Sequence, residues 1–194
     1  MNTASSQAKQ AVLAASVIDR GHFVFAAGNH ATVKLEMDHL WEHPPQLATI
    51  LSLLAKAEGL PPADAILGVP TGGQRLANAL GKKLHLPVVQ LERVPGGAKQ
   101  DFRFVSAADK ILAKSARSPR IYEDVVTTLS SVAGVVKLLN PAAQNIHALA
   151  IWLGGEVQPE YAHGVTPHFL VEEPMPSGPA GTCPACNPAL SPAL

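Results

Sequence analysis

Apolar and polar positions change their period several times between residues 63 and 153. Short, mostly apolar runs typical of buried strands occur at 63–69, 87–91, 120–123 and 145–153. Between these runs, three segments have the spacing of amphipathic helices, at 74–84, 106–116 and 130–139. Strands that alternate with helices form parallel sheets, because right-handed crossovers connect them. The pattern predicts an α/β fold with an open parallel sheet flanked by helices.

The first 60 residues have a different pattern of apolar and polar positions. Residues 1–20 become apolar with helical spacing and stop at Arg20-Gly21, which predicts a helix end. Residues 22–25 and 32–37 alternate apolar with polar around a turn at 27–30, as strands of a hairpin do. A second helix starts at Pro44-Pro45, carries an apolar stripe and ends before Gly59. We therefore expect a small N-terminal hairpin beside the sheet.

The chain after residue 154 is rich in Pro and Gly. One apolar run, 168–171, predicts an added edge strand, and we expect irregular chain after Glu173. The sequence thus suggests one domain at 1–173, whose first 45 residues or so form the hairpin part, and a tail at 174–194.

Composition argues against nucleic-acid binding and against a membrane-spanning segment. Fifteen Lys and Arg balance fifteen Asp and Glu, so no overall field attracts nucleic acid or an anionic membrane. Apolar residues make up 47% of the chain, yet no run reaches the roughly 18 residues that span a bilayer. We expect a cytoplasmic protein without a membrane segment. The two cysteines, both near the C-terminus, argue against a disulfide framework.

The stretch 120–132 carries the strongest chemical signal. A short apolar strand delivers Glu123 and Asp124 to the carboxyl edge of the sheet, where open α/β proteins bind ligands. A run of hydroxyl residues follows at 127–131, just before a helical pattern resumes, and such a position suits an anion. Adjacent carboxylates can otherwise be a solvated edge, but with the hydroxyl run they favour a phosphorylated sugar as ligand.

These residues resemble the ribose-phosphate signature of the type I phosphoribosyltransferases. The stretch 123–128 carries the signature, 68–73 is similar to the family's pyrophosphate loop, and 21–30 is similar to the hood turn of the orotate phosphoribosyltransferase branch. The resemblance extends over about residues 10–155 and implies the open-sheet fold with a hood hairpin. It also implies transfer of a phosphoribosyl group from phosphoribosyl pyrophosphate to a pyrimidine-like base, in pyrimidine nucleotide biosynthesis.

The resemblance also implies roles for individual residues. Glu123 and Asp124 would contact the ribose hydroxyls and act in catalysis, with Arg93 and Lys99 on a polar loop at 92–101 covering the leaving group. The contacts to phosphoribosyl pyrophosphate would come from the glycine turn and the acid-hydroxyl stretch: Thr71, Gly72, Gly73, Glu123, Asp124, Val125, Val126, Thr127, Thr128, Leu129, Ser130 and Ser131.

Base contacts would come from Phe25, Ala27, His30 and Trp152. For His30 the alternative is to close the hairpin, and for Trp152 it is to pack in the core. Mg²⁺ would share the charge of the pyrophosphate while keeping several waters. A homodimer, in which the mobile loop of one subunit reaches the neighbour's site, is the expected assembly.

The chain departs from the family pattern at two places. Leu129 stands where the pattern has glycine, and Leu153-Gly154-Gly155 stands where orotate enzymes have an Arg for the acid of the base. A second function therefore stays open, namely a non-catalytic or regulatory protein that binds nucleotide or phosphoribosyl pyrophosphate through a degenerate phosphate loop.

The tail contains Cys183-Pro-Ala-Cys186, which has the spacing of a zinc knuckle. A structural zinc site needs four ligands, and His163 and His168 are the nearest further candidates in the sequence. We expect no protein-held metal site and interpret this segment as a tail that packs against the domain or a partner subunit.

Overall fold

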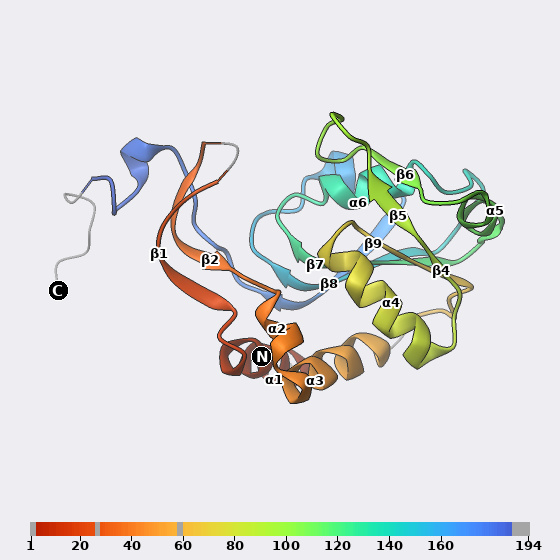
Figure 1. Ribbon diagram of the computed structural model, residues 1–194, viewed down its shortest axis with the longest axis horizontal. Helices are drawn as coiled ribbons and strands as arrows, with labels where there is room; N and C mark the ends of the chain where they lie inside the picture. The colour runs from red at the N-terminus through yellow and green to blue at the C-terminus, as the bar shows by residue number, and fades with distance from the viewer. Residues whose placement is uncertain (1–2, 26–27, 58–59, 188–194) are drawn as a thin grey trace.

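The computed structural model describes residues 3–25, 28–57 and 60–187 (Figure 1). Its centre is a five-stranded sheet in which every neighbouring pair is parallel. The strand order is β4 (Val88–Val89), β3 (Ala65–Gly68), β7 (Pro119–Val126), β8 (Ile146–Leu153) and β9 (Val165–Glu172). The predicted open parallel sheet is confirmed, and the expected edge strand is longer than its apolar run.

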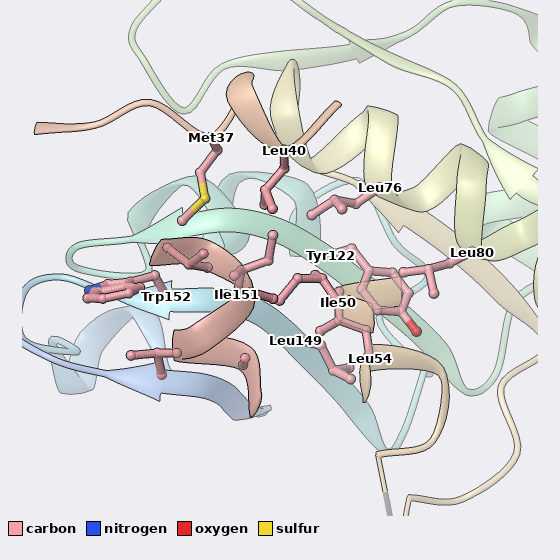
Figure 2. Packing of buried hydrophobic residues seen from close by; sticks show 14 of the residues in the cluster. Met37, Leu40, Ile50, Leu54, Leu76, Leu80, Tyr122, Leu149, Ile151 and Trp152 are labelled. Atoms are coloured by element: carbon pink, nitrogen blue, oxygen red, sulfur yellow. The ribbon is translucent and has the colours of Figure 1, made fainter. Parts of the chain in front are cut away.

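Helices cover both faces of the sheet. The cluster on one face includes residues of α1 (Thr3–Ala14), α3 (Pro44–Ala55) and α4 (Gly72–Leu84), and the cluster on the other includes residues of α5 (Ala107–Ser115) and α6 (Ser130–Val136). Side chains of a strand alternate between faces. Tyr122 and Leu149 therefore join the first cluster, shown in Figure 2, while their neighbours Ile121 and Ala148 join the second.

The N-terminal hairpin consists of β1 (Ile18–Val24) and β2 (His30–Leu35), paired antiparallel and followed by the short α2 (His39–Glu42). It stands beside the sheet, and the C-terminal tail runs along it (Figure 1). The preceding helix ends at Ala14 rather than at Arg20, because Ser16 has a positive φ of 52° and the strand begins at Ile18.

The segment predicted as one strand at 87–91 is divided. Only β4 joins the main sheet, and β5 (Leu91–Arg93) turns away to pair antiparallel with β6 (Phe102–Phe104). The expected polar loop is thus shorter, at 94–101, and Val94 N–H closes it on Asp101 O at 3.0 Å.

Short 3-10 turns at Pro159–Tyr161 and Ala180–Thr182 complete the described elements. Among the helices within the described ranges, none is long and apolar enough to cross a membrane.

Candidate active site

The two acids lie within β7 rather than beyond its end. The strand continues to Val126, with Glu123 opposite Ala150 and Val125 opposite Trp152 of β8. Alternation along the strand sends the adjacent acids to opposite faces. Asp124 faces the start of α4, and Glu123 faces the side where the β5–β6 hairpin lies.

The glycine turn at 70–73 packs directly against this part of β7. A Cβ atom added to Gly72 would lie 1.9 Å from Oδ2 of Asp124, and one added to Gly73 would lie 2.3 Å from the carbonyl oxygen of Tyr122. Val69 N–H also donates to Tyr122 O at 2.9 Å. Both glycines are therefore needed for the close approach of the turn to the acid pair.

Arg93 links the loop 94–101 to the same turn. Its Nη2 donates to Pro70 O at 2.7 Å, and its Nη1 donates to Lys99 O at 2.5 Å. The guanidinium also lies 5.5 Å from the centre of the Phe102 ring, within the range of a cation–π contact. The two basic residues predicted from the sequence thus lie close together, Arg93 at the end of β5 and Lys99 on the loop 94–101, and Arg93 bonds to the turn.

Burial sets the electrostatics of the acid pair. Burial, followed by the charge of Asp124, raises the pKa of Glu123 to about 8, against the opposing effect of Lys99 and Arg93. Burial also raises the pKa of Asp124, with a smaller contribution from Asp38, while a hydrogen bond of 2.8 Å from Val125 N–H lowers it. The pair therefore lacks enough cationic charge of its own, and hydroxyl donors or a cation would stabilise its ionised form.

This pKa predicts a pH dependence of stability. The folded protein keeps a proton on Glu123 above the ordinary pKa of 4.5, where the unfolded chain has lost it, so stability contributed by this group falls as the pH rises from about 4.5 to about 8. In urea denaturation between pH 5 and 9, Glu123→Gln should show a smaller loss of unfolding free energy than the parent. Parallel curves would contradict the burial assigned to this carboxyl.

The hydroxyl loop has the backbone shape that a glycine would give. Leu129 has φ 77° and ψ 1°, in the left-handed region, and its side chain is only 2% exposed because it packs in the cluster beneath α6. Thr128 Oγ1 lies 3.1 Å from Ser130 Oγ and accepts from Ser130 N–H at 3.4 Å. Leu129 therefore keeps the conformation and points into the core. Since α6 has seven residues, an anion would depend mainly on the loop itself.

Leu129→Gly should lower stability without improving phosphate binding. Glycine relieves about 1 to 2 kcal/mol of left-handed strain, but the loss of a buried leucine costs about 2 to 5 kcal/mol. We expect a net loss of about 1 to 3 kcal/mol in chemical denaturation, with the affinity for phosphoribosyl pyrophosphate within a factor of about two. A variant that is more stable, or that binds markedly more tightly, would show that the leucine obstructs the loop.

Residues after β8 support the hydroxyl loop from outside. Gly154 N–H donates to Val126 O at 2.9 Å, and Gln158 N–H donates to Thr128 O at 3.1 Å. A Cβ atom at Gly155 would lie 2.4 Å from Thr127 O. The pair of glycines after an apolar strand was the available sequence signal for this contact, and sequence reasoning treated it only as a missing arginine.

The predicted base-binding residues are separated. Phe25 lies at the end of the hairpin and is 37% exposed, and Ala27 lies outside the described residues. Trp152 is completely buried and donates Nε1–H to Glu173 O at 2.7 Å, so it packs in the core and is not free to stack on a base. His30 lies 2.9 Å from His22, between Nδ1 and Nε2.

The remaining predicted residues lie before α4, on β7 and in α6. Thr71 directly precedes α4, and Val125 and Val126 end β7. Ser131, in the first turn of α6, is buried. Val126 is also buried, so a ligand would meet it through the backbone.

Comparison with known proteins finds orotate phosphoribosyltransferases among the relatives of this chain. No family profile matches the chain. The orotate phosphoribosyltransferase of Heliobacterium modesticaldum is 26% identical over 182 residues, covering 89% of this chain and 88% of the relative. That of Thermotoga maritima is 27% identical over 172 residues, covering 86% and 85%.

Solved structures share the fold. The orotate phosphoribosyltransferase of Aeropyrum pernix superposes with a TM-score of 0.68 at 23% identity, covering 85% of this chain and 92% of that one. The adenine phosphoribosyltransferase of Giardia lamblia, in complex with 9-deazaadenine, superposes with a TM-score of 0.63 at 14% identity, covering 84% and 97%. The chain therefore has the fold of the type I phosphoribosyltransferases, and its sequence is similar to those of orotate phosphoribosyltransferases.

Proposed function

We propose that the protein transfers the phosphoribosyl group of phosphoribosyl pyrophosphate to a ring nitrogen of a pyrimidine-like base and releases pyrophosphate. The observation that carries this proposal is the meeting of three parts at one edge of the sheet. These are the half-buried acids Glu123 and Asp124, the glycine turn at 70–73 and the hydroxyl loop at 127–131. Each part suits one portion of the substrate.

The acids suit the ribose. Ionised carboxylates accept hydrogen bonds from hydroxyl groups and stabilise positive charge that develops on a sugar when its leaving group departs. Burial raises the pKa of both Glu123 and Asp124, so a hydroxyl donor or a positively charged sugar would stabilise their ionised forms. In the reaction the bond from C1 of ribose to pyrophosphate oxygen breaks, a bond from C1 to the base nitrogen forms, and the proton of that nitrogen leaves to solvent.

The two loops suit the phosphates. The backbone and hydroxyls of Thr127, Thr128 and Ser130 would hold the 5-phosphate, while Gly72 and Gly73 let the pyrophosphate approach the chain closely. Arg93 is already bonded to Pro70 O and would position the loop that carries Lys99 over the leaving group. Catalysis would depend on positioning and electrostatic stabilisation, without a protein nucleophile.

Mg²⁺ fits this site through its donor chemistry. Carboxylate oxygens are ligands that Mg²⁺ accepts, and the side chain of Asp124 supplies them next to the turn that would face pyrophosphate. When bound together with the substrate, the ion would neutralise part of the charge on pyrophosphate.

The described residues say less about the base than about the ribose and the phosphates. Leu153-Gly154-Gly155 brings no cation to the end of β8, and Asp38 and Glu36 add negative charge near Asp124. A base that carries its own carboxylate, such as orotate, would lack the expected partner. We favour a pyrimidine-like base because the relatives over most of the chain are orotate phosphoribosyltransferases.

The second candidate is a non-catalytic or regulatory protein that binds phosphoribosyl pyrophosphate or a nucleotide. The missing arginine supports it. Leu129 supports it less than its sequence position suggests, because the side chain points into the core. We also propose a cytoplasmic homodimer acting in pyrimidine nucleotide synthesis, by analogy with the orotate enzymes.

A two-stage experiment tests these candidates. Thermal shift with phosphoribosyl pyrophosphate, with and without Mg²⁺, measures binding, and pyrophosphate release with orotate, uracil, cytosine and adenine then measures transfer. We expect a Mg²⁺-dependent rise in Tm and release with at least one pyrimidine. Binding without release for every base would favour the regulatory protein, and no shift would refute both.

A further inference from the structure

Four potential metal ligands meet where the tail crosses the hairpin. His22 of β1, His30 of β2, and Cys183 and Cys186 of the tail each offer one ligand atom, and these four atoms all lie within 4.8 Å of one another. Sγ of Cys186 lies 3.2 Å from Nε2 of His22 and 3.2 Å from Nδ1 of His30, and these two nitrogens are 2.9 Å apart.

These distances match the edges of a tetrahedral zinc site. With bonds of about 2.0 to 2.1 Å to nitrogen and about 2.3 Å to sulfur, a regular tetrahedron has edges of about 3.3 Å between nitrogens and about 3.5 Å between nitrogen and sulfur. The observed separations fall within about half an ångström of those edges. His22, His30 and Cys186 would therefore need only small movements to surround one ion, and Sγ of Cys183 lies within 4.8 Å of their ligand atoms.

The hairpin register creates the histidine half of this cluster. Val24 pairs with His30 across the two strands, and His22 lies two residues before Val24, in the interval between Arg20 and Phe23 where the register shifts. The two rings have their centres 5.1 Å apart. The two histidines thus converge on neighbouring strands of the hairpin.

The tail delivers the cysteine half. Gly178 forms a bridge with His30, with N–H to O distances of 2.7 and 3.0 Å, and this bridge fixes the tail beside β2. The chain then turns at 180–182, and Cys186 N–H and Asn187 N–H both return to Cys183 O, at 3.1 and 2.9 Å. This tight turn places the two sulfur atoms on one side, as a zinc knuckle does.

The alternatives fit these contacts less well. Both cysteines are free thiols, so no disulfide explains the tail. A neutral imidazole has one N–H, which points outward in the ring plane and serves one good hydrogen bond. Three mutual contacts among His22, His30 and Cys186 are easier to understand when their lone pairs face a shared cation.

We propose that His22, His30, Cys183 and Cys186 bind one Zn²⁺ ion in a closed tetrahedral site. Two thiolates and two imidazoles are the ligands of structural zinc, and four protein ligands leave no position for a reacting water. The site is structural, and it fastens the C-terminal tail to the tip half of the hairpin. It does not depend on the proposed function.

This assignment replaces two expectations from the sequence. A zinc ligand through Nδ1 makes His30 part of the clamp rather than a base contact. In the sequence, His163 and His168 are the nearest further candidates for a second ligand pair, but Nε2 of His168, on the edge strand β9, lies 2.9 Å from Nδ1 of His147 on β8. The partners of the cysteines lie more than 150 residues earlier in the chain.

Metal content tests the proposal directly. The full-length protein, purified without a metal-affinity tag from zinc-supplemented cells, should hold about one Zn²⁺ per chain by elemental analysis. Cys186→Ser and His22→Asn should each lower this content at least about fivefold, while His163→Asn, an exposed histidine away from the cluster, should leave it unchanged. A substoichiometric content that the variants do not change would mean adventitious metal and would overturn the site.

Cobalt spectroscopy covers the case in which a variant does not fold. Co²⁺ substituted into the parent protein should give the intense visible bands of a tetrahedral ion and a thiolate charge-transfer band in the near ultraviolet. Zn²⁺ should displace them, and a chelator should lower Tm. Weak octahedral bands, or a Tm that the chelator leaves unchanged, would refute the proposal.

Discussion

Asp124→Asn should weaken binding of phosphoribosyl pyrophosphate by about 10- to 100-fold, the equivalent of about 1.5 to 3 kcal/mol for hydrogen bonds to a charged group. The asparagine keeps the shape of the side chain and an oxygen that can accept from Val125 N–H, as Asp124 Oδ1 now does at 2.8 Å. It removes the negative charge that would accept from a ribose hydroxyl or stabilise the sugar cation. Isothermal titration in the presence of Mg²⁺ measures the change.

The same variant should be at least as stable as the parent. Burial raises the pKa of Asp124, so its ionised form opposes folding at pH values above the ordinary pKa of 3.8. A neutral amide removes this cost, and denaturation in urea at pH 7.5 should show an equal or larger free energy of unfolding. If Asp124→Asn binds as tightly as the parent, the ribose assignment is wrong. If it unfolds, the carboxylate has a structural role instead.

The acid-hydroxyl stretch was predictable because its chemistry is contiguous in sequence. Glu123, Asp124 and the hydroxyl residues lie within a few positions, and a parallel sheet brings such a stretch to its carboxyl edge. The sequence did not show that β7 runs on past the acids to Val126, because the run 123–126 is half polar. The continued pairing with β8 keeps both acids in the strand.

Leu129 shows how a departure from a pattern can be misread. In the sequence it stands where glycine is expected, which suggests a damaged loop. In the fold its backbone takes the left-handed conformation, and its side chain contributes to the core under α6. Strain of about 1 to 2 kcal/mol is smaller than the gain from burying a leucine, of about 1.5 to 3 kcal/mol, so the exchange is tolerable. No local sequence signal reveals the direction of that side chain.

The zinc cluster was beyond sequence reasoning for a different reason. Its cysteines form a recognisable pair, but His22 and His30 look like ordinary strand residues of a hairpin. Only the register of β1 with β2 and the bridge from His30 to Gly178 bring the four residues together. Ligand sets made of long-range contacts require the tertiary structure, whereas ligand spacing within a segment can be seen in the sequence.

Backbone hydrogen bonds connect the tail to the hydroxyl loop of the candidate site. The tail begins after β9, where Glu173 N–H donates to Leu153 O at 3.1 Å and Met175 N–H donates to Gly154 O at 2.8 Å. Gly154 in turn bonds to Val126, at the start of the hydroxyl loop. A clamp on the far end of the tail therefore stabilises a segment that runs from the hairpin to the phosphate loop.

Gly73→Ala should lower the free energy of unfolding by about 3 kcal/mol, at the upper end of the range for overpacking. A Cβ atom at this position would lie 2.3 Å from Tyr122 O and 2.9 Å from the Cα atom of Glu123. Both are backbone atoms of a central strand, so relief requires that α4 move away from the sheet. Chemical denaturation measures the loss.

Gly72→Ala is the matched variant, since it adds the same methyl group one residue earlier. The three atoms nearest to its Cβ would all belong to the carboxyl group of Asp124, with 1.9 Å to Oδ2, and a side chain can rotate away where a backbone cannot. We expect a stability loss of about 1 kcal/mol or less, but a loss of affinity for phosphoribosyl pyrophosphate of at least about tenfold, because Asp124 is displaced.

The combination with Asp124→Ala separates these two effects. Shortening residue 124 removes the atoms that the new methyl group would strike, so Gly72→Ala should cost almost no stability in that background. Gly73→Ala should cost as much there as in the parent, since its obstacles are in the backbone of β7. Equal costs of Gly72→Ala in both backgrounds would mean that the glycine turn does not rest on Asp124, and the arrangement proposed for ribose and pyrophosphate would lose its structural basis.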